Sequence, residues 1–107
     1  MPNIFVTGYY PTHKVAEVVK KWFEVRKKFP PSEFPGELVV DSTTTATERG
    51  FETVSIYKIS EENLGKARMW ITKSLVPFQL IESFEYTIKT YVTTEEGLEA
   101  IGMKMPE

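Results

Sequence analysis

The sequence predicts an α+β domain with the element order β-α-β-β-α-β, in which two helices cover one face of a four-stranded antiparallel sheet. Three observations lead to this fold class. Four segments alternate side chains with the period of a β-strand, and two segments repeat apolar residues with the period of a helix. Each helical segment lies between two strand segments. Because crossovers between strands are right-handed, both helices are expected on the same face of the sheet.

Length and composition fit one folded domain. The chain has 107 residues, of which 41% are hydrophobic and 26% charged, so neither disorder nor a fibrous structure is expected. A domain of this size buries only about two-thirds of its unfolded surface, so a partner chain would add stability. The net charge of -2 argues against a nucleic-acid-binding surface, since such surfaces concentrate Lys and Arg.

The composition also excludes several kinds of site. There is no cysteine, hence no disulfide, thiolate nucleophile or cysteine-based metal site. His13 is the only histidine, and no His-Glu-x-x-His or Asp-x-Asp spacing occurs, so we predict no metal site and no cofactor. No apolar run approaches the roughly 20 residues that span a bilayer, and no leader-like segment opens the chain. We therefore expect a cytoplasmic protein with neither a membrane nor a nucleic acid as partner.

The first strand and first helix follow directly on one another. The strand is expected at about Asn3 to Tyr9, where both alternating sets of side chains include bulky apolar groups. Pro11 suits a first helical position, and the helix is expected from about Thr12 to Phe29. Its apolar stripe comprises Val15, Val18, Val19, Trp22 and Phe29.

A proline-rich connector, Phe29 to Gly36, ends this helix because proline cannot continue it. The β-branched run from Glu37 to Glu48 predicts the second strand. Arg49-Gly50 then predicts a hairpin turn into a third strand at Phe51 to Ile59.

The second helix is expected from about Glu61 to Val76, with Ser60 as N-cap and Pro77 ending it. Its inward stripe comprises Leu64, Ala67, Ile71 and Leu75, and Trp22 and Trp70 are expected as packing residues, with a cavity-facing Trp70 as the alternative.

A fourth strand is expected at Phe84 to Thr93. Thr93 and Glu96 have the spacing of a capping box for a short tail helix, so the chain divides into a domain of residues 1–94 and a helical tail of residues 95–107.

This order is that of the ferredoxin-like sandwich, which leaves one face of the sheet open. The helix-covered face is expected to carry Ile4, Val6, Val54, Ile56, Tyr86 and Ile88. The open face is expected to carry Phe5, Thr7, Tyr9, Thr53, Ser55, Tyr57, Thr87 and Tyr91. Aromatic side chains each bury about 150–250 Å² when covered, so a second copy, a ligand or single-stranded nucleic acid should cover this face.

The layout of residues 3–93, with a long first helix and a mixed open face, resembles the dimeric α/β-barrel superfamily. The resemblance implies a homodimer in which two sheets face each other around a cavity. It also implies a choice of chemistries, since that superfamily includes cofactor-independent monooxygenases, haem-degrading enzymes and small isomerases. The segment from Ile4 through Lys14 further resembles small uncharacterised archaeal proteins.

The RNA-recognition motif offers a competing resemblance, through Ile4 to Tyr9 and through Arg49 to Ile56. Its second motif would carry the main stacking aromatic where this chain has Thr53, and a small residue where this chain has Glu52. Stacking contributes about 1–3 kcal/mol per base, so this loss argues against RNA binding.

His13 is the candidate catalytic residue, because its side chain titrates near neutral pH and lies in the first turn of a helix. The helix N-terminus disfavours the imidazolium, which would leave a neutral base, and Asp41 is its candidate partner. An exposed surface histidine is the simpler interpretation. The candidate ligand-binding residues are Phe5, Thr7, Tyr9, Asp41, Thr53, Ser55 and Tyr57, although core packing is the simpler interpretation of the tyrosines.

These features together predict a homo-oligomeric small-molecule-binding protein or cofactor-independent enzyme, with its cavity between the sheets of a dimeric barrel. The alternatives are a structural module with a filled barrel and a binder of single-stranded RNA. The apolar residues of the tail, Leu98, Ile101, Met103 and Met105, predict an oligomer contact, because so short a helix must dock on its own domain or on a neighbour.

Overall fold

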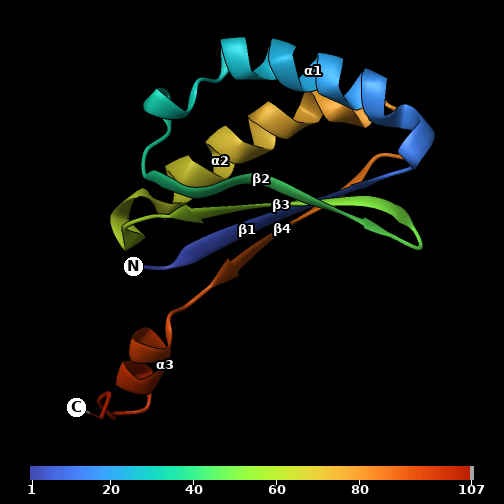
Figure 1. Cartoon of the computed structure of the whole chain (residues 1–107). Coiled ribbons are helices and arrows are strands. Elements are labelled where there is room, and N and C mark those ends of the chain that lie inside the picture. Colours follow the sequence, from blue (N-terminus) through green and yellow to red (C-terminus); the bar gives the residue numbers. More distant parts are fainter. Residues whose placement is uncertain (107) are drawn as a thin grey trace.

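The computed structural model describes residues 1–106, and its elements follow the predicted order (Figure 1). Strands β1 (Asn3–Tyr10), β2 (Glu37–Thr47), β3 (Gly50–Lys58) and β4 (Glu85–Tyr91) form one sheet. Its order is β2-β3-β1-β4, and each neighbouring pair is antiparallel. The predicted α+β fold class, a ferredoxin-like sandwich, is confirmed.

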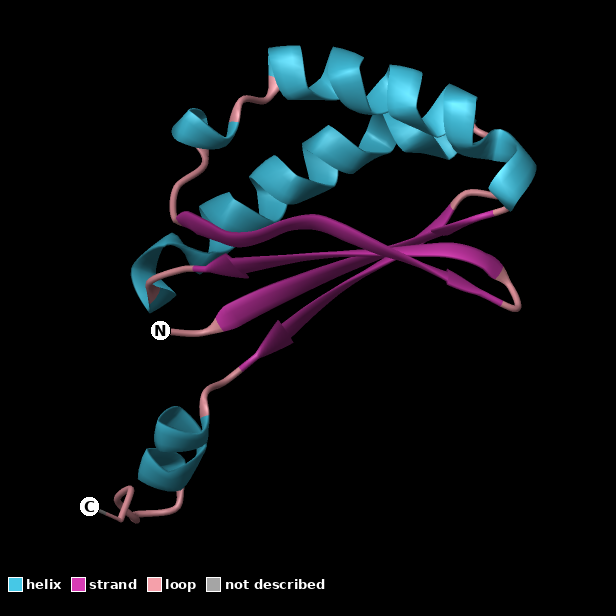
Figure 2. Ribbon diagram, in the orientation of Figure 1, coloured by secondary structure: helices cyan, strands magenta, loops and turns pink. Residues whose placement is uncertain are grey.

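Two main helices, α1 (Val15–Lys28) and α2 (Leu64–Leu75), lie on the same side of the sheet (Figure 2). Short 3-10 turns precede or follow them: η1 (Thr12–Lys14), η2 (Pro31–Glu33), η3 (Glu61–Asn63) and η4 (Val76–Leu80). Ser60 occupies the predicted N-cap position, ahead of η3, but its side chain makes no capping hydrogen bond. Within residues 1–106, no helix combines the length and the apolar character needed to cross a membrane.

The core lies between the sheet and the helices, in two clusters of buried side chains. The first comprises Ile4, Phe34, Ile59, Ala67 and Ile71, and the second comprises Tyr10, Val18, Phe78 and Ile81. Burying an isoleucine stabilises a fold by about 1.5–3 kcal/mol, and Ile4 and Ile59 have no exposed surface. The inward stripe predicted for the second helix is confirmed, since Leu64 and Leu75 pack against this core.

Helix α1 turns a narrower stripe inward than the sequence predicts. Val18 is buried and Trp22 packs beside it, whereas Val15 and Val19 are 40% and 43% exposed. The apolar pattern of this helix is wider than the surface it can bury, because valines occupy adjacent positions 18 and 19. The pattern therefore predicted the helix correctly, but it did not show which of the apolar side chains are buried against the sheet.

The predicted orientation of the third strand is wrong. Ser55 pairs with Val6, and Tyr57 pairs with Ile4, in the antiparallel register of β1 and β3. Directly paired residues share a face of the sheet, so Thr53, Ser55 and Tyr57 face the helices. The apolar side chains of Val54 and Ile56 face the open side instead. Alternation along a strand shows that its side chains divide between the two faces of the sheet. Pairing with β1 decides which of the two sets faces the helices.

A β-bulge interrupts β2 beside this region. The pairing with β3 shifts register between Leu38 and Val40 and again between Val40 and Thr43. Ser42 has a φ of 50°, in the left-handed region that non-glycine residues rarely adopt. Its backbone N–H donates to Ser55 Oγ at 3.0 Å, a bond across to β3. The bulge thereby turns this part of β2 toward α1.

The short helix α3 (Thr94–Ala100) lies beyond the sheet, on the side away from α1 and α2 (Figure 1). The predicted capping box is confirmed: Glu96 N–H donates to Thr93 Oγ1 at 3.1 Å, and Thr93 N–H donates to Glu96 Oε1 at 2.8 Å. The amino group of Met1 lies 3.1 Å from Glu96 Oε2. These bonds hold the start of the tail against the N-terminus.

Candidate functional site

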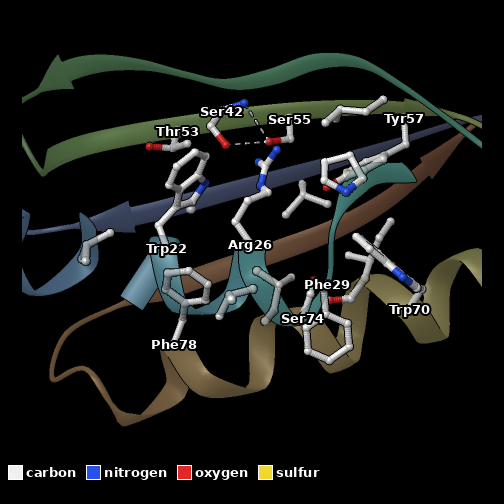
Figure 3. Close-up of a pocket in the computed structure, with 18 of the residues that line it drawn as sticks. Trp22, Arg26, Phe29, Ser42, Thr53, Ser55, Tyr57, Trp70, Ser74 and Phe78 are labelled. Atoms are coloured by element: carbon white, nitrogen blue, oxygen red, sulfur yellow. Dashed lines mark hydrogen bonds between the residues drawn. The ribbon is translucent and has the colours of Figure 1, made fainter. Parts of the chain in front are cut away.

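A cavity of about 110 Å³ lies between the helices and the sheet, within a single chain (Figure 3). This volume is smaller than the roughly 300–1,000 Å³ of typical ligand pockets. It approaches the about 150 Å³ of engineered apolar cavities that take up benzene. The space therefore suits a molecule of one small ring.

The walls of this cavity are largely aromatic. Trp22 comes from α1, Phe29 directly follows that helix, Trp70 comes from α2, Tyr57 from β3 and Phe78 from η4. Trp70 is held by edge-on contacts to Phe29 and Phe34, with ring centroids 5.8 and 5.1 Å apart. Such edge-to-face pairs fix the orientation of the rings, so this wall is pre-formed.

Polar groups gather on the sheet side of the cavity. Ser42 and Ser55 face each other with their hydroxyl oxygens 3.4 Å apart. The Arg26 guanidinium lies 4.5 Å from the centre of the Trp22 ring and donates to Asp41 at 3.0 and 2.7 Å. This bidentate geometry is the one in which guanidinium binds carboxylates best. One wall thus presents a cation and two hydroxyls, whereas Asp41, the carboxylate partner of that cation, does not itself line the cavity.

The charges and hydroxyls of this site have definite states at neutral pH. The hydrogen bonds from Arg26 lower the pKa of Asp41, while partial burial opposes this shift. Burial raises the pKa of Tyr57, with a smaller opposing effect from Arg26. Tyr57 therefore stays a neutral phenol that can donate a hydrogen bond, and Asp41 stays a carboxylate.

The predicted ligand-binding residues fall on opposite faces of the sheet. Thr53, Ser55 and Tyr57 line the cavity beneath the helices. Phe5, Thr7 and Tyr9 lie on the open face, because their partners on β3 are Ile56, Val54 and Glu52. The expectation that all six surround one cavity between two sheets is therefore wrong, and the inverted orientation of β3 is the reason.

His13 lies exposed in η1 and is not among the residues that line the cavity. Its predicted pairing with Asp41 is wrong, because that carboxylate accepts hydrogen bonds from Arg26 and Ser42 instead. The bulge in β2 turns Asp41 toward α1, which local sequence did not indicate. A catalytic role for His13 stays a prediction.

Sequence reasoning missed the contribution of α1 to the site. Arg26 follows Trp22 by four residues, so the two lie on one side of α1, and Phe29 follows directly after the helix ends. The sequence does contain a sign of this contribution, because Arg26 lies on an otherwise apolar stripe of the helix. A cation at such a position requires an anionic or aromatic partner nearby. Ser74, on α2, offered no comparable signal.

The open face of the sheet presents a different set of interactions. The Arg49 guanidinium lies 4.7 Å from the centre of the Tyr9 ring, and a hydrogen bond to Glu52 raises the pKa of Tyr9. Phe5 and Tyr91 meet edge-on with centroids 4.9 Å apart. Phe51, within the segment Arg49 to Ile56 that resembles the RNA-recognition motif, packs on Tyr10 beneath the helices. That side chain contributes nothing to a stacking surface on the open face.

Within residues 1–106, the structure brings together no group of three His, Cys, Asp or Glu side chains able to hold a metal ion.

Comparison with known proteins identifies the fold. No protein-family model and no curated protein matches this chain. The de novo designed protein Foldit4 is similar in structure, with a TM-score of 0.55 and 16% identity over 86% of this chain and 97% of its own. A candidate monooxygenase from Shewanella loihica PV-4 has a TM-score of 0.52 and 16% identity over 86% of this chain and 93% of its own. A fold shared with a designed protein carries no activity by itself, so function must be argued from the site.

Proposed function

We propose that this protein binds a small molecule in the cavity between its helices and its sheet. One observation carries the proposal: both tryptophans of the chain and Tyr57 surround a cavity whose sheet side presents Arg26 and the hydroxyls of Ser42 and Ser55. Apolar walls with a few convergent polar groups are the usual composition of ligand sites. The ligand class that fits is a small, flat, mostly apolar molecule with one acidic or hydrogen-bond-accepting group.

The polar groups indicate how such a ligand would be oriented. Its ring would lie against Trp22 and Trp70, and its acceptor group would point to the sheet side. There the guanidinium of Arg26 offers donors in a planar fork that matches a carboxylate. Because Asp41 already occupies this fork, an incoming carboxylate would have to share or displace it. A neutral acceptor, such as a phenol or a ketone, would use the hydroxyls of Ser42 and Ser55 without disturbing the ion pair.

Turnover of the bound molecule without a cofactor is the second candidate function. The support is that a candidate monooxygenase has the same fold, and that the half-buried, neutral hydroxyl of Tyr57 can donate to a substrate oxygen. Turnover is tested by measuring oxygen consumption. Consumption that occurs only when the small molecule is present and the cavity is intact would show turnover as well as binding.

Self-association through the open face is part of the same proposal. Phe5, Val54 and Ile56 share that face, and Tyr91 beside them is 46% exposed. A second copy would cover these side chains and leave each cavity within its own chain. The proposed oligomer therefore differs from a barrel whose ligand lies between the sheets.

Fluorescence tests the binding proposal directly, because both tryptophans line the cavity. Salicylate, with an acidic group, and phenol, with a neutral one, are suitable probes of one ring each. We expect at least one of them to change the tryptophan emission along a saturable curve. Linear changes at all concentrations for both probes would count against a site of this size and chemistry.

A pair of variants on α2 provides the control. Ser74 lines the cavity and donates to the carbonyl oxygen of Ile71, whereas exposed Thr72 makes the same kind of bond to Arg68 and lies outside the cavity. Ser74→Leu fills the cavity and should weaken probe binding at least tenfold. Thr72→Leu should bind as the unaltered protein does. Equal affinity of the two variants would place the probe elsewhere.

A further inference from the structure

A second hollow, distinct from the ligand cavity, lies between the end of α1 and the exposed side of α2. Its volume is about 570 Å³. Three lysines, Lys28, Lys66 and Lys73, line it with Glu33, so its net charge is +2 (three positive, one negative). Its apolar part comprises Phe29, Met69 and Trp70, and Met69 is 55% exposed. We call this site the basic hollow.

The described residues that follow β4, 92–106, have the complementary character, and we call this segment the tail from here on. Val92, Ile101, Met103 and Met105 are 66%, 70%, 56% and 49% exposed. The same segment carries three glutamates and one lysine, so its net charge is -2 (one positive, three negative). A helix of seven residues has little stability alone in water, so α3 gains from docking its apolar side on another surface.

The tail does not lie near the basic hollow of its own chain. The hollow belongs to the helix layer, whereas β4 delivers α3 to the far side of the sheet (Figure 1). The bond between Met1 and Glu96 and the capping box hold the start of α3 in this position. An apolar tail held away from its own body is available to another molecule, and opposite charge favours the encounter.

We propose that the tail of one copy docks in the basic hollow of a second copy. The methionines and Ile101 of the tail would pack on Met69 and Phe29, and Glu95 and Glu99 would face the surrounding lysines, while Glu96 stays bound to Thr93 and Met1. This contact joins two different surfaces, so it is heterologous and builds a ring or a chain of subunits.

The docked tail would also reach the ligand cavity of its neighbour indirectly. Phe29 and Trp70 line both the basic hollow and the cavity. A tail lying on these two rings holds the shared wall in place and shields it from water. Assembly would then influence ligand affinity, although the docking itself does not depend on a ligand.

The absence of cysteine from the chain allows a direct test by disulfide trapping in the full-length protein. One chain would carry both Met69→Cys and Met103→Cys. Under mild oxidation we expect covalent dimers and larger species, with peptide mapping that joins positions 69 and 103. The control chain carries Phe23→Cys and Met103→Cys, because Phe23 is equally exposed, at 58%, on the other helix.

Each outcome of the trapping experiment decides the proposal. Links between positions 69 and 103 of different chains, at least tenfold more abundant than links to position 23, support it. Equal trapping in the control, links within one chain, or links only between two copies of position 103 would overturn it.

A charge placed in the hollow gives an independent measurement. Met69→Glu should abolish association through the tail, and Phe23→Glu should leave it unchanged, in sedimentation velocity of the intact chain. If the open sheet face also forms a dimer, the Met69→Glu variant should remain that dimer and lose only the larger species. Association unaffected by Met69→Glu would refute tail docking. Neither disulfide trapping nor sedimentation velocity requires a ligand. Tail docking can therefore be supported or refuted independently of whether the protein binds a small molecule in its cavity.

Discussion

Ser55 is the residue on which the sheet side of the cavity most depends. It is only 8% exposed, and its hydroxyl accepts the backbone N–H of Ser42 at 3.0 Å. Ser42 holds a left-handed conformation that a serine adopts at some cost. The hydroxyl thus stabilises the bulge that directs Asp41 to Arg26. Ser55, which the sequence suggests as a ligand-binding residue, therefore also stabilises the fold.

Removal of this hydroxyl has a measurable cost. Ser55→Ala leaves the N–H of Ser42 without its partner, so we expect a loss of about 1 kcal/mol in the free energy of unfolding. Urea unfolding provides the measurement. Thr45→Ala, at an exposed position of the same sheet, should change stability by less than about 0.5 kcal/mol. Equal effects of the two variants would show that the Ser42–Ser55 bond contributes nothing.

The Arg26–Asp41 pair should make stability depend on acid pH. The pKa of Asp41 is lowered in the folded state, so its carboxylate stabilises the fold above the unfolded pKa of about 3.9 and loses this contribution as the pH falls through the folded value. Asp41 is 44% exposed, which limits the effect to less than about 1 kcal/mol. Asp41→Asn should therefore be less stable than the unaltered protein at pH 7. The difference should shrink as the pH falls below the unfolded pKa of about 3.9, and a difference that stays constant through that fall would contradict the assignment.

At the scale of elements, the β2–β3 hairpin and its register with β1 determine the site. Gly50 begins β3 with a φ of 112°. A Cβ atom at this position would collide with the carbonyl oxygen of Tyr10 on the neighbouring strand. The backbones of β1 and β3 can therefore approach only because this residue is glycine, and the register that turns Ser55 and Tyr57 inward depends on that approach.

Two glycine substitutions should have opposite effects. Gly50→Ala introduces both the collision and the unfavourable φ, so we expect a loss of more than about 2 kcal/mol in the free energy of unfolding. Gly65 lies in the first turn of α2, where an added Cβ atom would meet no other atom within 4 Å. Gly65→Ala should therefore stabilise the protein by up to about 1 kcal/mol. Thermal unfolding distinguishes the two, and a stabilising Gly50→Ala would refute the strand register.

At the scale of the whole molecule, the sheet separates two candidate interaction surfaces. Its helix-covered face holds the aromatic cavity, and its open face combines apolar side chains with the charged cluster of Arg49, Glu52 and Glu85. The tail leaves the molecule on this open side (Figure 1). A second copy on the open face would therefore lie next to the tail. The open-face contact and the tail that takes part in the second proposed contact thus lie on the same side of the sheet.

Association through the open face can be tested at one position. Ile56→Lys places a charge among Phe5 and Val40, so we expect the dimer to dissociate to a monomer or to weaken at least tenfold. Light scattering over a range of concentrations measures this change. Thr72→Lys, on the exposed side of α2, should retain the mass of the unaltered protein. A mass insensitive to Ile56→Lys would exclude this face as the interface.

Local sequence determined the element order, the inward stripe of α2 and the capping box of α3, because each depends on periodicity or on residues within one turn. Only the tertiary structure decided which side of β3 faces the helices, that Asp41 pairs with Arg26, and that the cavity lies within one chain. Periodicity defines two sets of side chains without stating which is inside. That choice is made by pairing between strands distant in sequence and by the bulge at Ser42, and neither leaves a local pattern.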